Sequence, residues 1–187
     1  MSALPKKLYS PEEYLALERV AEYKSQYFAG EIFAMAGGAP RHNLISTNVI
    51  GELYALLKGR PCKVYPSDQC LKIPATGLYT YPDVSVVCGE AQFDDEDLLL
   101  NPILLVEILS ESTEAHDRGK KFEHYMRIPS FREYLLIAQD RYRIEHYVKQ
   151  DDGGWSFFVV SDLQGSIKLF SLNCELAVAE IYYQIKF

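Results

Sequence analysis

Hydrophobic residues fill the segment Ile103–Leu109 and are interrupted only by Glu107. A run of this kind, rich in large and β-branched residues and introduced by Asn101-Pro102, predicts a strand that is buried on both faces of a sheet. A carboxylate is almost never fully buried unless it is paired, because an isolated charge is very unstable in a low-dielectric interior. We therefore expect a positive group beside Glu107, either a metal ion or a cationic side chain.

A second buried strand with an acid at its head is predicted earlier in the chain, at Asp83–Cys88. Two carboxylates on neighbouring rigid strands supply the hard oxygen ligands that Mg²⁺ requires. Alternatively, Asp83 and Glu107 each cap a strand end or pair with a nearby arginine. The pattern leaves both interpretations open, although the occurrence of two such strands favours a metal site.

The remaining pattern alternates between helical and extended periods. A capping box at Ser10–Glu13 predicts a helix that ends near Tyr23, and Gln26–Phe28 with Glu31–Met35 predict a hairpin. The rest of the chain predicts, in order, a helix at Arg41–Lys58, strands at Cys62–Ser67, Gln69–Ile73, Asp83–Cys88 and Ile103–Leu109, a helix at Thr113–Ile128, strands at Glu133–Ala138, Arg141–Val148 and Trp155–Val160, and a short helix at Leu176–Tyr183.

This order of elements predicts the class of fold. Helices and strands are interspersed along the chain, which indicates an α/β protein with a mixed β-sheet flanked by three or four helices, plus an N-terminal helix and hairpin. The 187 residues fit a single domain, 1–187, with a substantial core. The sequence contains no internal repeat and no low-complexity segment.

The net charge of −7 argues mildly against a nucleic-acid binder that relies on its overall field. The charges are unevenly distributed, however: from Ile73 to Asp117 there are ten acidic residues and no Lys or Arg, and basic residues follow at once. This arrangement suits a metal site flanked by phosphate-binding groups. On charge alone, a solvated acidic loop followed by a helix of mixed surface charge is the better interpretation.

The cysteines and the apolar segments predict a protein of a reducing compartment, the cytoplasm. Cys62, Cys70, Cys88 and Cys174 lack CxxC spacing, so we interpret them as small buried hydrophobes and not as a zinc site or a disulfide framework. No stretch reaches the length of a membrane span, and Met1–Lys7 lacks the apolar core of a secretory signal. We expect a cytoplasmic protein that does not contact a membrane.

Two adjacent lysines occur on the helix predicted after Glu107. At 100° per residue, Lys121 falls beside the apolar side of that helix, whereas Lys120 points almost directly away from it. Lys121 can therefore lay its stem along the core and direct its ammonium group toward Glu107. An i,i+4 pair between Asp117 and Lys121 is an equally good interpretation.

These segments together resemble a known family. The matching stretches are Gly30-Glu31-Ile32, Met35-Ala36-Gly37-Gly38, His42-Asn43, Tyr81-Pro82-Asp83-Val84, Val106–Thr113, Asp117–Lys121 with Tyr125, Arg132-Glu133-Tyr134 and Glu180-Ile181-Tyr182. They are similar to proteins of the Uma-type family of restriction-endonuclease-like proteins, a branch of the PD-(D/E)XK nuclease superfamily. The resemblance covers nearly the whole chain and implies a restriction-endonuclease-like core.

The resemblance also implies roles for particular residues. Asp83 matches the acid of the PD element and Glu107 matches the second acid, both of them metal ligands in that fold, with Mg²⁺ or Mn²⁺ as the implied cofactor. Lys121 matches the lysine that this branch carries on the following helix, in place of the usual strand position, which is Leu109 here. His42 matches a family histidine and is a candidate for binding substrate.

The implied activity is metal-dependent hydrolysis of DNA phosphodiester bonds by an endonuclease. A divalent ion held by Asp83 and Glu107 would activate water, and Lys121 would serve as a base or as an electrostatic stabiliser. Further candidates for binding the DNA backbone are the arginines Arg118, Arg127 and Arg132.

Two other functions stay open. Relatives commonly carry Glu where this chain has Gln26, so a catalytically weak or inactive nuclease fold that binds nucleic acid or protein is the alternative. A metal-dependent hydrolase of another phosphoester is the third. The apolar segment Trp155–Val160 suits a homodimer interface.

Overall fold

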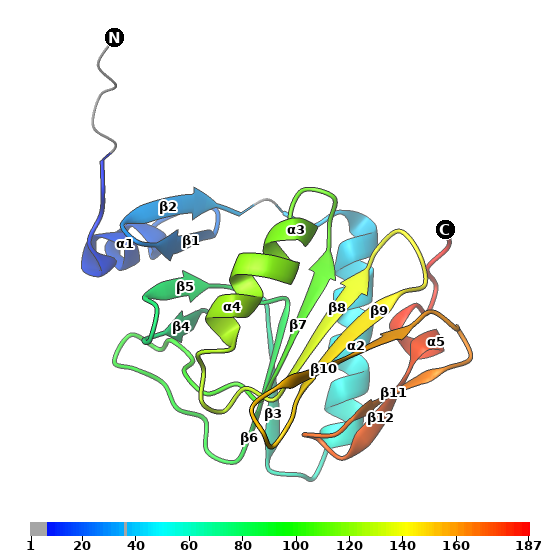
Figure 1. Ribbon diagram of the computed structural model, residues 1–187. Coiled ribbons are helices and arrows are strands. Elements are labelled where there is room, and N and C mark those ends of the chain that lie inside the picture. Colours follow the sequence, from blue (N-terminus) through cyan, green and yellow to red (C-terminus); the bar gives the residue numbers. More distant parts are fainter. Residues whose placement is uncertain (1–6, 36) are drawn as a thin grey trace.

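The fold is built around a mixed six-stranded sheet (Figure 1). The computed structural model describes residues 7–35 and 37–187. Residues 1–6, most of the segment in which we expected no secretory signal, and Ala36 of the matching motif lie outside the described residues. The strands, in spatial order, are β10 (Trp155–Val160), β9 (Ile144–Lys149), β8 (Glu133–Ala138), β7 (Leu104–Leu109), β6 (Val84–Cys88) and β3 (Cys62–Pro66). Only β7 and β8 pair in parallel, which their helical crossover permits. The predicted α/β class with a mixed sheet is confirmed.

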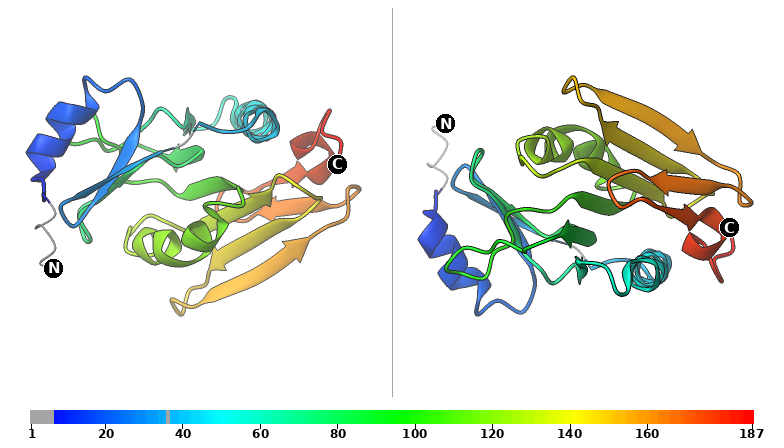
Figure 2. Two further views of the ribbon diagram at one scale, coloured as in Figure 1. Left: turned by 90° about the horizontal axis from the view of Figure 1, so that it is seen from above. Right: turned by 90° about the horizontal axis from the view of Figure 1, so that it is seen from below.

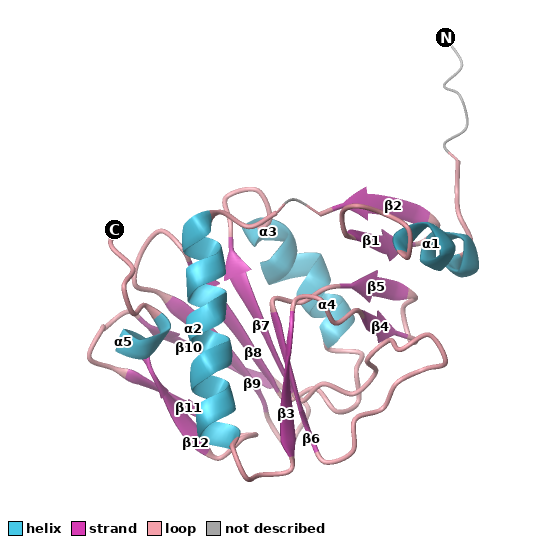
Figure 3. Ribbon diagram, turned by 180° about the vertical axis from the view of Figure 1, so that it is seen from behind, coloured by secondary structure: helices cyan, strands magenta, loops and turns pink. Residues whose placement is uncertain are grey.

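Helices cover both faces of this sheet (Figures 2 and 3). On one face, α2 (Pro40–Leu57) buries Ile45, Val49 and Leu53 against alternate residues of the strands. On the other face, the segment that includes α4 (Phe122–Tyr125) buries Tyr125 against the remaining strand residues. Both faces of β7 are therefore buried, which explains its almost uninterrupted apolar sequence.

A smaller sheet stands beside the upper part of the molecule in Figure 1. Its strands, in spatial order, are β2 (Glu31–Ala34), β1 (Ser25–Phe28), β5 (Leu78–Thr80) and β4 (Leu71–Ile73), and α1 (Pro11–Glu18) packs on it. The predicted capping box of α1 is present: the Ser10 hydroxyl accepts from the Glu13 amide, and the Glu13 carboxylate accepts from the Ser10 amide. The hairpin after it is confirmed, whereas β5 was not predicted and α1 ends earlier than expected.

The C-terminal part adds a two-stranded sheet and a short helix. Strands β11 (Ser166–Leu169) and β12 (Cys174–Ala177) form a hairpin, followed by α5 (Val178–Ile181), which lies beside α2 (Figure 3). We predicted only the helix, because each of these strands has only four residues, too few for a clear periodic pattern. Among the residues that the structure describes, no helix is both long and apolar enough to cross a bilayer.

The predicted helix at Thr113–Ile128 is divided into three pieces. Helix α3 (Glu114–His116) leads into a π-helical turn, η1 (Asp117–Lys121), which continues into α4. A π turn closes i→i+5 hydrogen bonds and is found mostly at functional sites. It changes the direction in which Asp117 and Lys121 project, and both are buried.

The interpretation of the cysteines was wrong for one pair. Cys62 on β3 and Cys88 on β6 occupy directly opposed positions of two antiparallel strands and form a disulfide. Strand pairing brings them together across 26 residues of sequence, which their spacing alone did not indicate. Cys70 and Cys174 are free, as expected.

Candidate active site

Of the two predicted metal-ligand residues, Glu107 lies on β7 and Asp83 lies just before the neighbouring strand β6. In the antiparallel ladder of β6 and β7, Val84 is opposite Val106 and Ser85 is opposite Leu105. Extending this register by one residue places Asp83 opposite Glu107. Glu107 points toward the α4 side, where Tyr125 and Lys121 bind it, whereas Asp83 binds His42 of α2 at the end of the sheet.

Asp83 is held in place by both of its oxygens. Its Oδ2 accepts a hydrogen bond of 2.7 Å from the backbone amide of Ile108, and its Oδ1 lies 3.0 Å from Nε2 of His42. His42 lies in the first turn of α2, so the start of this helix reaches the head of β6. Burial disfavours the charged imidazole, but the hydrogen bond to Asp83 and the charges of Asp83 and Glu107 outweigh it, so the pKa of His42 is raised.

Glu107 is almost completely buried and has two direct partners. Its Oε1 accepts a hydrogen bond of 2.7 Å from the Tyr125 hydroxyl and lies 2.8 Å from Nζ of Lys121. Burial raises the pKa of Glu107 to about 8, opposed by the charge of Lys121 and reinforced by the charges of Asp117 and Asp83. The positive group that we expected beside Glu107 is therefore present, and it is a side chain.

Lys121 is the cation at the centre of this cluster. Besides Glu107, its ammonium group lies 3.5 Å from Oδ1 of Asp117, so both of the contacts that we had weighed occur together. Burial disfavours the charged amine, but the Glu107 and Asp117 carboxylates outweigh it and the pKa of Lys121 is raised. Lys120 is exposed, as its position on the helical wheel predicted.

The cluster holds more acidic side chains than cations. Asp83, Glu107 and Asp117 all act on one buried ammonium group, and because the pKa values of Glu107 and His42 are both raised, the charge of these two groups depends on pH. Buried like charges repel strongly in a low-dielectric interior, so a second cation at this point would be stabilising. The chemistry of the donors, carboxylate oxygens on rigid strands, suits a hard divalent cation.

The three predicted arginines lie in separate places. Arg118 is held by Glu145, with Nε and Nη2 at 3.0 and 3.2 Å from the two carboxylate oxygens, and by Glu114 at 2.6 Å. Arg132 donates to the backbone carbonyls of Pro129 and Phe131. Arg127 lines a cavity beside the end of α4. The structure brings none of them into hydrogen-bond contact with Asp83 or Glu107.

Two positions depart from the expected family pattern. Gln26 lies on β1, where its Oε1 accepts a hydrogen bond of 3.4 Å from the Thr80 hydroxyl. Leu109, at the usual position of the strand lysine, is buried in the apolar layer under α4. The ammonium group reaches Glu107 from the helix instead, through Lys121.

Sequence reasoning missed two parts of the site. Asp117 was considered only as a helical partner of Lys121, and its approach to Glu107 depends on the π turn. Tyr125 was named as part of the matching motif, without a partner, although its hydroxyl binds Glu107. The sequence did carry a signal for this bond: a tyrosine on the helix that follows a strand with a buried acid can donate its hydroxyl to that acid.

Comparisons with known proteins assign the chain to a family. Residues 11–179 match the Uma2 family, described as "Putative restriction endonuclease". The chain belongs to this family. Two proteins of Synechocystis sp. are similar to it: "Uncharacterized protein slr1290" is 39% identical, with 95% of this chain and 93% of that protein aligned, and "Uncharacterized protein sll1609" is 37% identical, with 85% and 89% aligned.

A solved structure shares the fold of this family member. It is the crystal structure of a "putative nuclease belonging to DUF820" from Anabaena variabilis, with a TM-score of 0.75, 18% sequence identity and coverage of 91% of this chain and 96% of that chain. The expected restriction-endonuclease-like fold is therefore confirmed. Family and fold together indicate a restriction-endonuclease-like nuclease.

Proposed function

We propose that this protein is a metal-dependent endonuclease that hydrolyses DNA phosphodiester bonds, with Asp83 and Glu107 holding one divalent cation. The observation that carries this proposal is that Asp83, just before β6, binds the backbone of β7 next to Glu107, while the buried Lys121 binds Glu107. Nuclease membership of the family makes a phosphodiester the natural substrate.

Mg²⁺ fits this donor set better than a softer metal. Proteins usually bind Mg²⁺ through one or two carboxylates and leave its other positions to water and substrate phosphate. No group of three or more His, Cys, Asp or Glu side chains with metal-binding geometry occurs in residues 7–35 and 37–187. Two carboxylates and an excess of negative charge match Mg²⁺ or Mn²⁺ and do not match the closed, nitrogen- and sulfur-rich sites of structural zinc.

The bound ion would polarise the scissile phosphate and lower the pKa of a water molecule. Lys121 would contribute a fixed positive charge next to the reacting phosphate, where negative charge develops in the transition state. Its position favours electrostatic stabilisation over proton abstraction, because two carboxylates hold the ammonium group in its charged form.

Two side chains and one backbone amide would position the metal ligands. The Tyr125 hydroxyl fixes the orientation of the Glu107 carboxylate, and His42 with the Ile108 amide fixes that of Asp83. Such contacts keep metal ligands in place and are often nearly as important as the ligands. The side chain of His42 is 17% exposed, so it also lies where substrate could reach it.

Cleavage of supercoiled plasmid DNA tests the activity. The wild-type protein should nick or linearise the plasmid with Mg²⁺ or Mn²⁺ and not with EDTA, whereas Asp83→Asn should be inactive at equal folded concentration. The matched control is Asp140→Asn, which removes an exposed carboxylate outside the cluster. Equal activity of wild type and Asp83→Asn would contradict the proposed site.

A catalytically weak module that binds nucleic acid or protein is the second candidate. Gln26 in place of Glu favours it, because a neutral side chain adds no charge for a metal. Plasmid binding without cleavage, together with metal binding too weak to measure at millimolar concentration, would support this second function.

We also propose that two copies of the chain associate through β10. This strand lies at one edge of the six-stranded sheet, and Phe157, Phe158 and Val159 on it are 50%, 47% and 41% exposed. An edge strand offers unpaired backbone groups that a second strand can satisfy. Light scattering should give a dimer, and Phe158→Lys should give a monomer; a wild-type mass of 21.4 kDa would contradict the association.

A further inference from the structure

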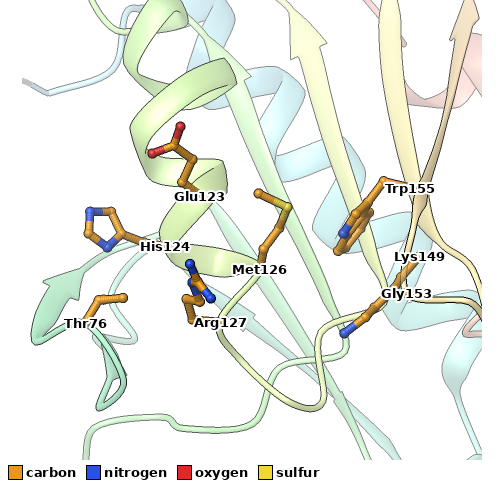
Figure 4. A pocket seen from close by; sticks show the side chains of 8 residues that line it. All are labelled: Thr76, Glu123, His124, Met126, Arg127, Lys149, Gly153 and Trp155. Carbon is orange, nitrogen blue, oxygen red and sulfur yellow. The ribbon is translucent and has the colours of Figure 1, made fainter.

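A cavity of about 510 Å³ lies beside the end of α4, the helix whose Tyr125 binds Glu107 (Figure 4). Its walls come from three places: the end of α4, the turn between β4 and β5, and the hairpin of β9 and β10. Tyr125, on the same helix, points inward to Glu107, whereas the cavity lies against neighbouring residues of that helix.

Two cations in this cavity have no anionic partner. Arg127 and Lys149 line it, and neither side chain forms a hydrogen bond or ion pair with the part of the chain that the structure describes. The one acid in the lining, Glu123, lies at the opposite end of the cavity from the Lys149 amine in Figure 4. Unneutralised cations of this kind favour an anionic ligand.

Two buried polar atoms in the same cavity also lack partners. Thr76 Oγ1 and His124 Nδ1 are inaccessible to solvent and form no hydrogen bond within the described residues. A buried polar atom without a partner costs about 1–3 kcal/mol. Because neither atom is open to solvent, both lie behind the surface of the cavity.

The cavity has an apolar wall beside its charged one. Trp155 and Met126 form it, and the indole of Trp155 is supported from behind by Phe122 and Phe131, at 5.1 and 5.3 Å between ring centroids. Lys149 is the direct cross-strand partner of Trp155, so a cation and an aromatic ring project from the same side of the hairpin. This combination is typical of surfaces that bind single-stranded nucleic acid.

Basic residues lie along the helical segment beside the cavity. Lys120, His124 and Arg127 follow one another at spacings of four and three, which places them on one side of the segment. Burial and neighbouring cations lower the pKa values of His116 and His124, which favours their neutral forms. The fixed positive charges of the cavity are therefore those of Arg127 and Lys149.

We propose that this cavity binds a single-stranded segment of nucleic acid next to the cleavage site. Arg127 and Lys149 hold successive backbone phosphates, and a base packs on Trp155. The identity of the ligand rests on the nuclease function proposed above. A duplex keeps its bases stacked inside, so it presents no ring to the Trp155 wall.

The protein has a single tryptophan, so the fluorescence of Trp155 reports directly on the cavity. The probe is an oligonucleotide of twelve thymidines, titrated in EDTA so that neither metal nor cleavage affects the result. We expect quenching of the wild-type fluorescence. In Arg127→Gln/Lys149→Gln the midpoint should rise at least tenfold, and the salt slope should fall by about 1.4, since each lost single-strand phosphate contact removes roughly 0.7.

A matched control variant separates local contacts from overall charge. Arg141→Gln/Lys168→Gln removes the same two charges from positions outside the cavity and should shift the midpoint less than threefold. Circular dichroism confirms that both variants are folded. Absence of quenching in the wild type, or equal shifts in the two variants, would overturn the proposal, as would equal quenching by inorganic polyphosphate, which has no bases.

Failure of this proposal can be distinguished from failure of the endonuclease. Asp83→Asn should keep the thymidine-dependent quenching, because the cavity does not include Asp83. Quenching in a protein that never cleaves DNA would support the cavity and contradict the endonuclease. Cleavage that depends on Asp83, without any quenching, would do the reverse.

Discussion

Two buried glutamates on neighbouring strands have opposite environments. Glu107 on β7 faces α4, whereas Glu133 on β8 faces α2, because Glu133 is paired with Leu104 and side chains alternate along the strand. Both are buried, at 4% and 0% exposure. They differ in what surrounds each carboxylate.

Glu133 is fully satisfied by hydrogen-bond donors. Its Oε1 receives hydrogen bonds from the Phe170 amide at 2.9 Å and from Nε2 of His146 at 3.0 Å, and its Oε2 receives bonds from the amide and the hydroxyl of Ser171. Burial alone would raise its pKa, but the bonds from His146 and Ser171 outweigh burial and the pKa of Glu133 is lowered. This glutamate fastens the β11–β12 hairpin to the central sheet.

Glu107 has fewer donors and two acidic neighbours. It is bound by Tyr125 and Lys121, while Asp83 and Asp117 act against its ionisation, and its pKa is raised to about 8. A buried carboxylate that evolution kept for stability alone would be expected to resemble Glu133. The difference teaches that burial does not distinguish a structural acid from a functional one, whereas the balance of donors and charges around it does.

The largest expected effect concerns stability. Glu133→Ala leaves four donors without an acceptor and should lower the free energy of unfolding by about 3–5 kcal/mol, the usual cost of breaking a buried ionic network. Glu107→Gln should change it by no more than about 1 kcal/mol, since Gln keeps an acceptor for Tyr125, Lys121 keeps Asp117 as its partner, and repulsion from Asp83 and Asp117 is removed. Urea denaturation measures both. A larger loss for Glu107→Gln would reverse the comparison.

The second effect concerns turnover. Lys121→Ala should lower the rate of DNA cleavage by about 10² or more, which corresponds to roughly 2.7 kcal/mol of transition-state stabilisation. Lys120→Ala, which removes an exposed ammonium group from the next position, should leave turnover nearly unchanged. Rates are compared at saturating DNA. Equal losses of cleavage rate in Lys121→Ala and Lys120→Ala would contradict the proposed catalytic role of Lys121.

Lys121→Ala is also expected to destabilise the fold. A lysine on the flank of a helix buries mainly its stem, but this one is only 5% exposed and faces two carboxylates. Its removal leaves buried negative charge uncompensated, at a cost of several kcal/mol. Divalent metal should recover part of the loss, which thermal melting with and without Mn²⁺ would detect.

The smallest effect is the dependence of stability on pH. Because the folded pKa of Glu133 is lowered, its contribution is present above the unfolded value, near 4.3, and is lost as the pH falls through the folded pKa. The stability difference between wild type and Glu133→Gln should therefore shrink as the pH falls below about 4. Denaturation midpoints at pH 7, 5 and 3.5 measure it, and a constant difference would show that Glu133 titrates normally.

Much of the fold could be predicted from the sequence. The strands β7, β8 and β10 and helix α2 carry long, unambiguous patterns, and their predicted bounds agree with the structure within one or two residues. The short strands β5, β11 and β12 were missed, because three or four residues carry too little periodicity. The Cys62–Cys88 disulfide was missed because it depends on strand register, a tertiary property.

The candidate site divides in the same way. Asp83, Glu107 and Lys121 could be singled out because each breaks a local pattern or lies at its boundary. The approach of Asp117 depends on a π turn, for which the helical pattern gives no signal, and the bond from His42 to Asp83 depends on how α2 packs. Local sequence therefore indicated which side chains are unusual, and tertiary packing determined how they are joined.

Titration calorimetry with Mn²⁺ tests the central claim most directly. If the unbalanced carboxylates form a cation site, the wild type should bind one ion, Glu107→Gln and Asp83→Asn should bind at least tenfold more weakly, and Glu133→Gln should bind like the wild type. Absence of binding at millimolar Mn²⁺, or binding that survives both substitutions at the site, would contradict the claim.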